Sequence, residues 1–272
     1  MTRLADRLSA VADDLVAAYD SATTLSPITA RRPDFSVLEA YAVLGEIERR
    51  RRAQGWQAVG RKIGFTNRTI WPRYGVHQPM WAPVWSRTLH QAPDCRARLP
   101  LAGFVQPRLE PEVVFKLKGP VPVSDDPREI LASVEWLAPG FEIVQSHFPD
   151  WKFTAADCTA AFGLHGALVV GPAMPVVDAG ALVEKLSGFD ATLSRDGTVV
   201  DRGSGANVLG SPLLALGHLA GVLATQPEFP PLAAGEIVTT GTLTDAWPVQ
   251  SGETWTSDYG ALGLPGLTLR FD

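Results

Sequence analysis

Residues 107–117 read PRLEPEVVFKL, with two glutamates one residue apart at the start of a run rich in Val and Phe. The run from Glu112 to Leu117 is predicted to be a strand. Because side chains alternate between the two faces of a strand, Glu110 and Glu112 are expected to share one face and to lie close together. Two neighbouring carboxylates repel each other unless one keeps its proton or a cation lies between them. A hard cation such as Mg²⁺ suits these oxygens, whereas the alternative is a pair of solvated glutamates.

Pro111, between the two glutamates, points to the opposite face of the predicted strand. A proline has no N–H to donate to a sheet, so it is confined to strand starts, edges and bulges. We therefore expect this segment to begin a strand or to lie at the edge of a sheet.

The overall composition is typical of a globular protein with a substantial core. The chain has 272 residues, of which 46% are hydrophobic and 19% charged, and its formal net charge is −5. This charge leaves no basic face for a nucleic-acid backbone. The N-terminus has no apolar signal-peptide segment, no uninterrupted apolar run has the length of a membrane span, and the two cysteines, Cys95 and Cys158, indicate neither disulfides nor a zinc site. We expect a cytoplasmic protein with no nucleic-acid or membrane partner.

Periodicity divides the chain into a helical N-terminal portion, residues 1–58, and a β-rich domain, residues 59–272. Apolar positions recur at helical spacing over residues 2–20 and 36–54. From Val59 the pattern changes to short apolar runs broken by Gly and Pro, which is typical of strands. The predicted strands are 59–65, 112–117, 136–144, 166–170, 191–195, 237–242, 253–257 and 266–271, and further helices are predicted at 127–133 and 212–224. The predicted fold class is therefore α+β.

Two more charged residues stand in apolar or glycine-bounded strands. Glu142 interrupts the apolar run 136–144, where a buried charge would need a partner or an ion, although a solvated strand face is the alternative. Lys62 lies between Gly60 and Gly64, where it could reach a carboxylate or a substrate oxyanion, although an isolated lysine is usually a surface residue.

Two short loops with hydroxyl side chains could hold a carboxylate. Thr240-Gly241-Thr242 ends a predicted strand, and Gly203-Ser204-Gly205 could be a second such loop. The latter is too short to be a phosphate-binding signature. The sequence contains no nucleophile elbow around a serine and no glycine-rich dinucleotide loop.

A set of short motifs in fixed order resembles one enzyme family. The matching stretches are 60–66 (GRKIGFT), 107–112 (PRLEPE), 135–139 (EWLAP), 142–144 (EIV), Asp150-Trp151, Gly203-Ser204, 209–212 (LGSP), 234–238 (AGEIV) and 240–242 (TGT). Together they are similar to the 2-keto-4-pentenoate hydratase/2-oxo-acid decarboxylase group of the fumarylacetoacetate hydrolase superfamily. The resemblance covers the chain from about residue 5 to its end.

The resemblance implies a β-rich, fumarylacetoacetate-hydrolase-like roll with a helical N-terminal portion, usually assembled as a homo-oligomer. It also implies that Glu110, Glu112 and Glu142 bind a Mg²⁺ or Mn²⁺ ion and that Lys62 lies at this metal site. In the family the metal chelates the 2-oxo-carboxylate end of the substrate and stabilises an enolate, which is Lewis-acid catalysis. Members then hydrate a 2-hydroxydienoate, decarboxylate a vinylogous 2-oxo acid or cleave an acylpyruvate.

The sequence departs from the family pattern where an acid or base is expected. His77 and Met80 stand in the segment 75–81, which usually carries acidic residues in the family. Phe162 and His165 lie in a stretch that is normally Asp-Asn with small residues, so we expect a bulkier and more apolar pocket. His77 is the candidate for proton transfer, because histidine titrates near neutral pH. His165 could approach the distal end of the substrate, and the alternative for each histidine is a packed loop residue.

The predicted function is that of a divalent-metal-dependent hydratase or lyase acting on a small 2-oxo acid through a metal-bound enolate. A decarboxylase or an acylpyruvate C–C hydrolase of the same family is the first alternative. A catalytically silent subunit that binds metal and stabilises a partner enzyme is the second. The expected site consists of Lys62 and His77 as catalytic residues, Glu110, Glu112 and Glu142 as metal ligands, and Phe162, His165, Ser204 and Thr242 around the substrate.

Overall fold

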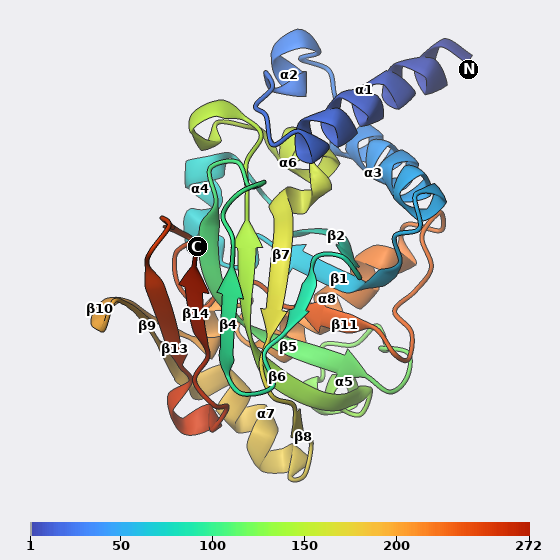
Figure 1. The fold of residues 1–272 in the computed structure, drawn as a ribbon. Coiled ribbons are helices and arrows are strands. Elements are labelled where there is room, and N and C mark those ends of the chain that lie inside the picture. The colour runs from blue at the N-terminus through green and yellow to red at the C-terminus, as the bar shows by residue number, and fades with distance from the viewer. Residues whose placement is uncertain (1) are drawn as a thin grey trace.

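Two packed β-sheets form the centre of the molecule, and helices surround them (Figure 1). The computed structural model describes residues 2–272, with the backbone alone at Thr2, Arg3, Arg73 and Tyr74. In spatial order the larger sheet contains β2 (Met80–Trp85), β1 (Ala58–Gly64), β11 (Ile237–Thr239), β5 (Arg108–Leu117), β6 (Val134–Val144), β7 (His165–Val170) and β3 (Leu89–Gln91), with β12 (Trp247–Pro248) beside β5 and β8 (Met174–Pro175) beside β6. The smaller sheet contains β10 (Thr198–Ser204), β9 (Asp190–Arg195), β13 (Thr254–Asp258), β14 (Thr268–Phe271) and β4 (Arg96–Leu99).

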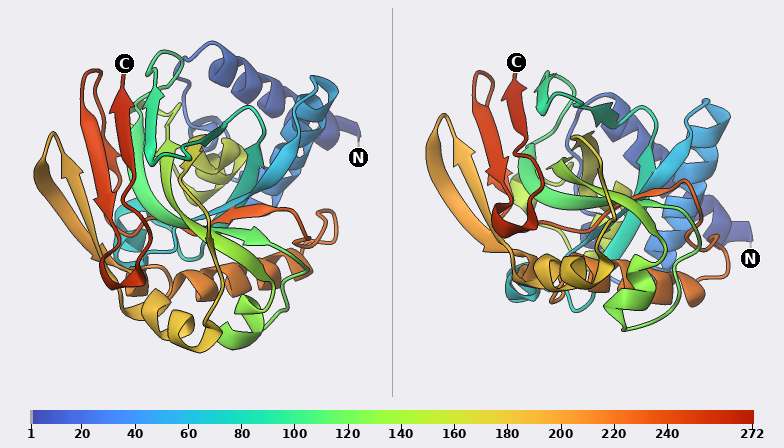
Figure 2. Two further views of the ribbon diagram at one scale, coloured as in Figure 1. Left: turned by 60° about the horizontal axis from the view of Figure 1, so that its bottom comes forward. Right: turned by 90° about the horizontal axis from the view of Figure 1, so that it is seen from below.

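The helices lie in two groups at opposite ends of the sheets (Figures 1 and 2). At the top of Figure 1 are α1 (Thr2–Asp20), α2 (Ile28–Arg31), α3 (Val37–Ala53) and α6 (Ala155–Ala160). The second group, which lies along the bottom of both views in Figure 2, contains α5 (Pro127–Leu131), α7 (Ala179–Gly188) and α8 (Pro212–Ala224), while the short α4 (Trp71–Tyr74) follows β1. The α+β class predicted from the sequence is confirmed.

Alternation along β5 gives the larger sheet two different faces. Odd-numbered positions such as Val113 and Phe115 are fully buried in the apolar layer beneath α7 and α8. Even-numbered positions face the concave side of the sheet, where Val114 joins another apolar cluster. Glu110 and Glu112 are even-numbered too, so the alternation that anchors β5 by its outer face directs both carboxylates inward.

The larger sheet curls until its concave side is enclosed (Figure 2). The strands β2 and β7 are separated by β1, β11, β5 and β6 in the sheet, yet Val84 of β2 and Val170 of β7 pack in one cluster with Val114. The interior therefore has one end filled with aliphatic side chains and another end that carries the two glutamates.

Pro111 lies in the middle of a central strand, so the predicted strand start or sheet edge is wrong. On one side of β5 the neighbouring strands are interrupted, because β11 pairs with residues 114–116 and β12 with residues 108 and 109. The carbonyl of Pro111 accepts from the N–H of Leu243 on this side, and the nitrogen of the same residue faces the same way. The missing N–H of proline therefore falls in the gap between the two pairings and costs no ladder hydrogen bond.

The N-terminal helices pack on the rest of the fold through their own apolar cluster, which includes Val11, Leu15, Val43 and Ile47. Arg51, near the end of α3, is buried within this region. Its guanidinium carbon lies 4.4 Å from the ring centroid of Trp56, and it pairs with Asp20 over 2.7 Å. Aromatic stacking and one carboxylate thus compensate a buried charge.

The segment Gly205–Ala224 is long and apolar enough to cross a membrane by length and composition alone, contrary to the expectation that no run has that length. The continuous helix α8 covers only part of it, and Gly210, with φ +92°, lies before the helix start. Leu213, Leu216 and Leu219 are fully buried in the core. The apolar character of α8 is therefore that of a core helix.

Several elements were not predicted from the sequence. They are the strands β2, β3, β4, β8, β10 and β12 and the helices α2, α4, α6 and α7. All residues of β2 (MWAPVW) are buried, so it lacks the alternation of a half-exposed strand, and it contains a proline. Short strands of this kind are stabilised by neighbours from distant parts of the chain, which a local pattern does not reveal.

Gly60 marks the closest approach of β1 to β11. A Cβ at Gly60 would lie 1.8 Å from the carbonyl oxygen of Ile237. We expect Gly60→Ala to push the strands apart and to lower the free energy of unfolding by about 1–3 kcal/mol or more, as overpacking does. Urea unfolding followed by circular dichroism measures the change. Gly119→Ala is the matched control, because nothing lies within 4 Å of a Cβ there; equal stability of the two variants would contradict the prediction.

Candidate active site

Three carboxylates meet on the concave side of the larger sheet. Glu110 and Glu112 lie on β5, and Glu142 lies on β6 directly opposite Glu110 in the antiparallel register. One carboxylate oxygen from each of them lies within 4.8 Å of the others. Glu112 and Glu142 are fully buried, and Glu110 is partly exposed. Strand alternation thus pairs two carboxylates, and the register between β5 and β6 adds the third.

Lys62 places its ammonium group beside this cluster. Its Nζ lies 3.1 Å from Oε2 of Glu142 and donates to the carbonyl oxygen of Gly163 over 3.1 Å. Lys62 reaches the site because β1 pairs with β11, which in turn pairs with β5. The ion-pair partner comes from β6 and the hydrogen-bond acceptor from the turn after α6, so the ammonium group joins three separate parts of the chain.

The charges of this cluster do not balance, and the pKa values shift accordingly. Burial raises the pKa of Glu110 to about 7, although Lys62 opposes the shift. Burial, and then the charge of Glu142, raise the pKa of Glu112 well above its usual range. Although burial acts in the opposite direction, Lys62 and His165 lower the pKa of Glu142. Lys62 and Glu142 therefore form an ion pair beside two carboxyl groups that resist ionisation.

Donors from the segment after β11 fix Glu112. Its Oε2 accepts from the N–H of Gly241 over 2.7 Å and from the hydroxyl of Thr239. Gly241 has φ +102°, and a Cβ there would lie 1.9 Å from Oγ1 of Thr66, so only glycine fits. The other oxygen of Glu112, Oε1, is buried with no hydrogen-bond partner among the residues that the structure describes.

His165 orients Glu142 from behind the cluster. Its Nδ1 lies 2.8 Å from Oε1 of Glu142, and its Nε2 lies 2.8 Å from Oγ1 of Thr88. Because an ionised carboxylate can only accept, Nδ1 carries a proton and donates it. His165 is 2% exposed and does not line the cavity, so its contacts are with Glu142 and Thr88.

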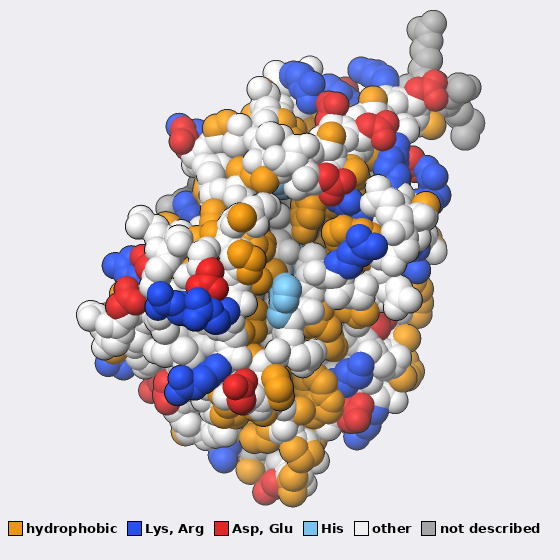
Figure 3. Space-filling model, viewed as in Figure 1, with side chains coloured by type: hydrophobic (Ala, Val, Ile, Leu, Met, Phe, Trp, Pro, Cys, Tyr) orange, Lys and Arg blue, Asp and Glu red, His pale blue; other side chains and the backbone are white. Residues whose placement is uncertain are grey.

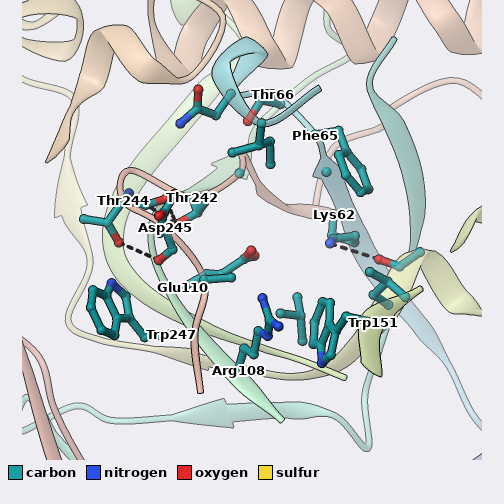
Figure 4. A pocket seen from close by; sticks show the side chains of 18 of the residues that line it. Lys62, Phe65, Thr66, Arg108, Glu110, Trp151, Thr242, Thr244, Asp245 and Trp247 are labelled. Atoms are coloured by element: carbon teal, nitrogen blue, oxygen red, sulfur yellow. Dashed lines mark hydrogen bonds between the residues drawn. The ribbon is translucent and has the colours of Figure 1, made fainter. Parts of the chain in front are cut away.

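A cavity of about 240 Å³ extends from this cluster (Figure 4). This volume is below the roughly 300–1,000 Å³ of pockets for drug-sized ligands, so the cavity suits a smaller molecule. Lys62 and Glu110 line its inner end. The wall also includes Thr66, Arg108, Trp151, Thr242, Asp245 and Trp247.

The structure brings five of the predicted site residues together. Lys62, Glu110 and Thr242 line the cavity, and Glu112 and Glu142 complete the carboxylate cluster at its inner end.

The other four predicted residues do not line the cavity; they are His77, Phe162, Ser204 and His165. His77 is exposed. Phe162 is buried against the N-terminal helices, with its ring centroid 4.6 Å from that of Tyr19, so it does not make the pocket bulkier. The hydroxyl of Ser204 accepts from the N–H of Ala206 and caps a short helical turn. The hydroxyl loop that reaches the cavity is the one around Thr242.

Three residues of the cavity wall were not singled out from the sequence. Arg108 precedes Glu110 by two residues, so the alternation that paired the glutamates also predicts its position. Thr66 is buried, and its hydroxyl has no hydrogen-bond partner among the described residues. Asp245 is placed by a distant contact, because Oδ2 of Asp201 accepts from its backbone N–H over 3.0 Å. No local signal in the sequence reports that contact.

The cavity wall contains residues with left-handed backbone conformations. Phe65, Trp151 and Leu164 have φ values of 56°, 57° and 64°. Each such non-glycine residue costs of order 1–3 kcal/mol and persists only where the surrounding packing holds it. The turn Phe162–Leu164 is left-handed at all three residues and presents the carbonyl of Gly163 to the ammonium group.

The donor set fits a hard divalent cation. Three carboxylates offer oxygens close together, and Oε1 of Glu112 has no other partner within the described part of the chain. Burial raises the pKa of both Glu110 and Glu112, and the negative charge of Glu142 adds to each shift, so a cation at the cluster would offset the cost of ionising them. Oxygen-only sites of this kind select Mg²⁺, Ca²⁺ or Mn²⁺ over softer metals.

Known proteins with similar sequences belong to one family. Residues 82–265 match the family described as fumarylacetoacetate (FAA) hydrolase C-terminal. The chain is 33% identical over 261 residues to a 2-hydroxyhexa-2,4-dienoate hydratase of Comamonas testosteroni, covering 94% of each chain. It is 28% identical over 270 residues to a 4-oxalocrotonate decarboxylase of Pseudomonas sp. (strain CF600), covering 98% of this chain and 97% of the relative.

A solved structure shows the same fold over nearly the whole chain. It is 4-oxalocrotonate decarboxylase from Pseudomonas putida G7, complexed with magnesium and adipate, with a TM-score of 0.88, 25% identity and 98% of both chains covered. The resemblance and the roll predicted from the sequence motifs are therefore confirmed. On sequence and structure together, this chain belongs to the fumarylacetoacetate hydrolase family.

Proposed function

We propose that the protein is a divalent-metal-dependent lyase that acts on a small 2-oxo acid, as a hydratase of a 2-hydroxydienoate or as a decarboxylase. The observation that carries the proposal is the cluster of Glu110, Glu112 and Glu142 at the inner end of a small cavity. The names of its relatives support both reactions, because they include 2-keto-4-pentenoate hydratases as well as 4-oxalocrotonate decarboxylases.

In this proposal the three glutamates hold a Mg²⁺ or Mn²⁺ ion. When bound, the cation supplies positive charge beside the 2-oxo-carboxylate group, where negative charge develops during the reaction. His165 fixes the orientation of Glu142, and the N–H of Gly241 fixes that of Glu112. Such outer partners of metal ligands orient the ligands and tune the metal.

Lys62 is proposed to bind and orient the substrate. Its ammonium group has three N–H donors; one donates to the carbonyl of Gly163, and the group forms an ion pair with Glu142. A remaining donor can reach a substrate oxygen, because Lys62 also lines the cavity. Burial lowers the pKa of Lys62, but Glu142 and the other two carboxylates raise it by more, so the ammonium group stays charged. Lys62 is therefore proposed as a charged hydrogen-bond donor to the substrate.

Proton transfer is proposed to involve Asp245, in preference to His77. Asp245 lies on the cavity wall, whereas His77 is not among the residues that line the cavity. A general acid or base must come within hydrogen-bond reach of the atom that it protonates or deprotonates. Asp201 holds the loop in place, since its carboxylate accepts from the backbone of Asp245 and from the ring N–H of Trp247 over 2.8 Å.

We further propose a cytoplasmic homo-oligomer. On the face shown in Figure 3, charged side chains of both signs are interspersed, and apolar side chains gather along its middle and lower part. A monomeric mass in light scattering across the working concentration range would contradict this assembly.

Metal binding and turnover are expected to depend on Glu112. We expect Mg²⁺ to raise the melting temperature of the wild-type protein. Glu112→Gln should abolish both this rise and turnover, because the neutral amide of glutamine lacks the negative charge that binds the cation. Turnover is measured by absorbance with 2-hydroxypenta-2,4-dienoate and with 4-oxalocrotonate. Glu135→Gln is the control, since Glu135 is an exposed residue of the same strand as Glu142. A Mg²⁺-dependent shift without turnover of either acid would contradict the proposal and favour a catalytically silent metal-binding subunit.

The affinity for Mg²⁺ is expected to rise with pH. The pKa of Glu110 is about 7 before a cation binds, so below this pH the cation must displace a proton. The dissociation constant should fall by up to about tenfold per pH unit for each proton displaced. Calorimetry in two buffers of different ionisation enthalpy counts the released protons. An affinity that does not change between about pH 6 and about pH 8 would contradict the shifted pKa.

The free energy of unfolding of the metal-free protein, in contrast, should fall as the pH rises. Because the folded-state pKa of Glu110 is raised from 4.5 to about 7, ionisation penalises the folded state. Protonated Glu110 therefore contributes fully to the free energy of unfolding below its unfolded-state pKa. This contribution is lost as the pH rises through about 7. Urea unfolding with a chelator present measures this trend in the same preparation.

Loss of the Asp245 carboxylate should slow the reaction without weakening metal binding. We expect Asp245→Asn to lower kcat by roughly 10²–10⁴-fold, the usual contribution of general acid–base catalysis. The Mg²⁺-induced rise in melting temperature should remain. Asp94→Asn serves as the control, because Asp94 is exposed and does not line the cavity. A larger loss in His77→Asn than in Asp245→Asn would overturn the choice of Asp245.

A further inference from the structure

We propose that Gln106 is a positioning residue that holds one wall of the cavity and thereby sets the affinity for the carbon tail of the substrate. Gln106 is not among the described residues that line the cavity. It acts through the turn Pro149–Trp151, whose last residue does line it. This role rests on the proposed function, because it takes the 2-oxo-carboxylate end of the substrate to be held at the glutamate cluster.

The turn Pro149–Trp151 has a backbone that its own residues do not favour. Asp150 and Trp151 are both left-handed, each with φ +57°, and neither is a glycine. Within the turn, the N–H of Trp151 donates to the carbonyl of Phe148 over 3.3 Å. Consecutive left-handed residues of this kind persist only where the surrounding structure holds them. Contacts from another part of the chain are therefore needed.

The side-chain amide of Gln106 supplies these contacts. Its Nε2 donates to the carbonyl of Ser146 over 2.8 Å and to that of Phe148 over 2.9 Å. Its Oε1 accepts from the N–H of Asp150 over 2.9 Å. One amide thus uses both of its N–H donors and its oxygen, and it binds the chain both before the turn and within it.

The backbone of Gln106 holds the indole ring of Trp151 as well. Its carbonyl accepts from the ring N–H over 3.0 Å. The ring also lies against Arg108, whose guanidinium carbon is 4.1 Å from the ring centroid. Gln106 therefore fixes both the backbone and the ring of the residue that forms this part of the cavity wall.

Trp151 lies on the apolar side of the cavity. It packs in one cluster with Val144 and Leu164, and all three residues line the cavity. Figure 4 shows Asp245 on the opposite side of Glu110 from Trp151. A carbon tail is expected on the apolar side, because burial of each methylene group there is favourable.

The inner end of the cavity does not depend on this turn. Lys62 and Glu110 belong to β1 and β5, which are held by strand pairing on both sides. The amide of Gln106 makes no hydrogen bond to either residue. Displacement of the turn should therefore weaken binding of a tail and leave the 2-oxo-carboxylate end unaffected.

A purely structural role is the competing interpretation of Gln106. In that case its removal lowers the stability of the fold and does not change the relative affinity for different substrates. Gln226 provides a matched control, because its Oε1 accepts from the ring N–H of Trp81 over 2.7 Å and neither residue lines the cavity.

The test compares 2-oxohexanoate with pyruvate in the presence of Mg²⁺. The two acids share the 2-oxo-carboxylate end and differ only in three further carbons of the tail. Titration calorimetry gives the dissociation constant of each acid. We expect the wild-type protein to bind 2-oxohexanoate about tenfold or more tightly than pyruvate, because the added carbons are buried against the apolar wall.

The variants separate positioning from stability. Gln106→Met keeps the length of the side chain and removes its hydrogen bonds. We expect it to weaken 2-oxohexanoate by about 4–15-fold, which corresponds to one or two buried methylene groups, while pyruvate binds as before. Gln226→Met should bind both acids like the wild-type protein. If Gln106→Met does not fold, Gln106→Asn decides, because it draws the amide back by one carbon; its affinity for 2-oxohexanoate must fall while that for pyruvate is unchanged.

Hydrogen exchange measured by mass spectrometry reports on the turn itself. In Gln106→Met the amides of residues 148–152 should exchange faster than in the wild-type protein, because the N–H of Asp150 loses its acceptor. The amides of β5 and β6 should exchange at the wild-type rate. Gln226→Met should leave residues 148–152 unchanged.

Four results would overturn the role of Gln106. An unchanged exchange rate at residues 148–152 in Gln106→Met shows that the amide does not hold the turn. An unchanged affinity for 2-oxohexanoate in that variant, or a parallel loss of affinity for both acids, shows that the turn does not select the tail. Equal affinity of the wild-type protein for the two acids overturns the role of Gln106 and leaves the proposed function standing. Failure of the wild-type protein to bind either acid with Mg²⁺ overturns the proposed function as well.

Discussion

Burial of the Lys62–Glu142 ion pair beside two further carboxyl groups is the constraint on which the rest of the site depends. Removing either partner of such a pair leaves an uncompensated charge and costs several kcal/mol. The pair joins β1 to β6, which are neighbours in neither sequence nor sheet and are connected only through β11 and β5. The order of these strands is therefore an electrostatic requirement of the site as well as a matter of packing.

The opposite face of β5 supplies the rigidity that this arrangement needs. Val113 and Phe115 are fully buried, so β5 cannot slip by one residue without exposing them and turning both glutamates outward. Tyr259 adds a polar restraint, because its hydroxyl lies 3.0 Å from the carbonyl oxygen of Glu112 and 3.2 Å from that of Gly140. The same alternation thus secures the core and aims the carboxylates.

The sequence predicts features that depend on neighbouring residues and misses those that depend on contacts between distant parts of the chain. Alternation over three residues was enough to pair Glu110 with Glu112, and the ordered motifs identified the family. The register that sets Glu142 opposite Glu110 is a contact between strands, and the position of Asp245 depends on Asp201. No local pattern reports such contacts. The expectation that Pro111 marks a strand start failed for the same reason, because the gap beside it belongs to neighbouring strands.

The left-handed turns around the cavity divide the site into two parts that can change independently. The inner end is built on paired strands, where a substitution disturbs buried charge. The outer wall is built largely on turns such as the one at Trp151, whose backbone N–H donates to the nearby carbonyl of Phe148. Mutation can therefore reshape the part of the cavity that meets the tail of a substrate while the carboxylates stay in place. Such a division lets the fit to a substrate tail change while the buried charge cluster of this chain is kept.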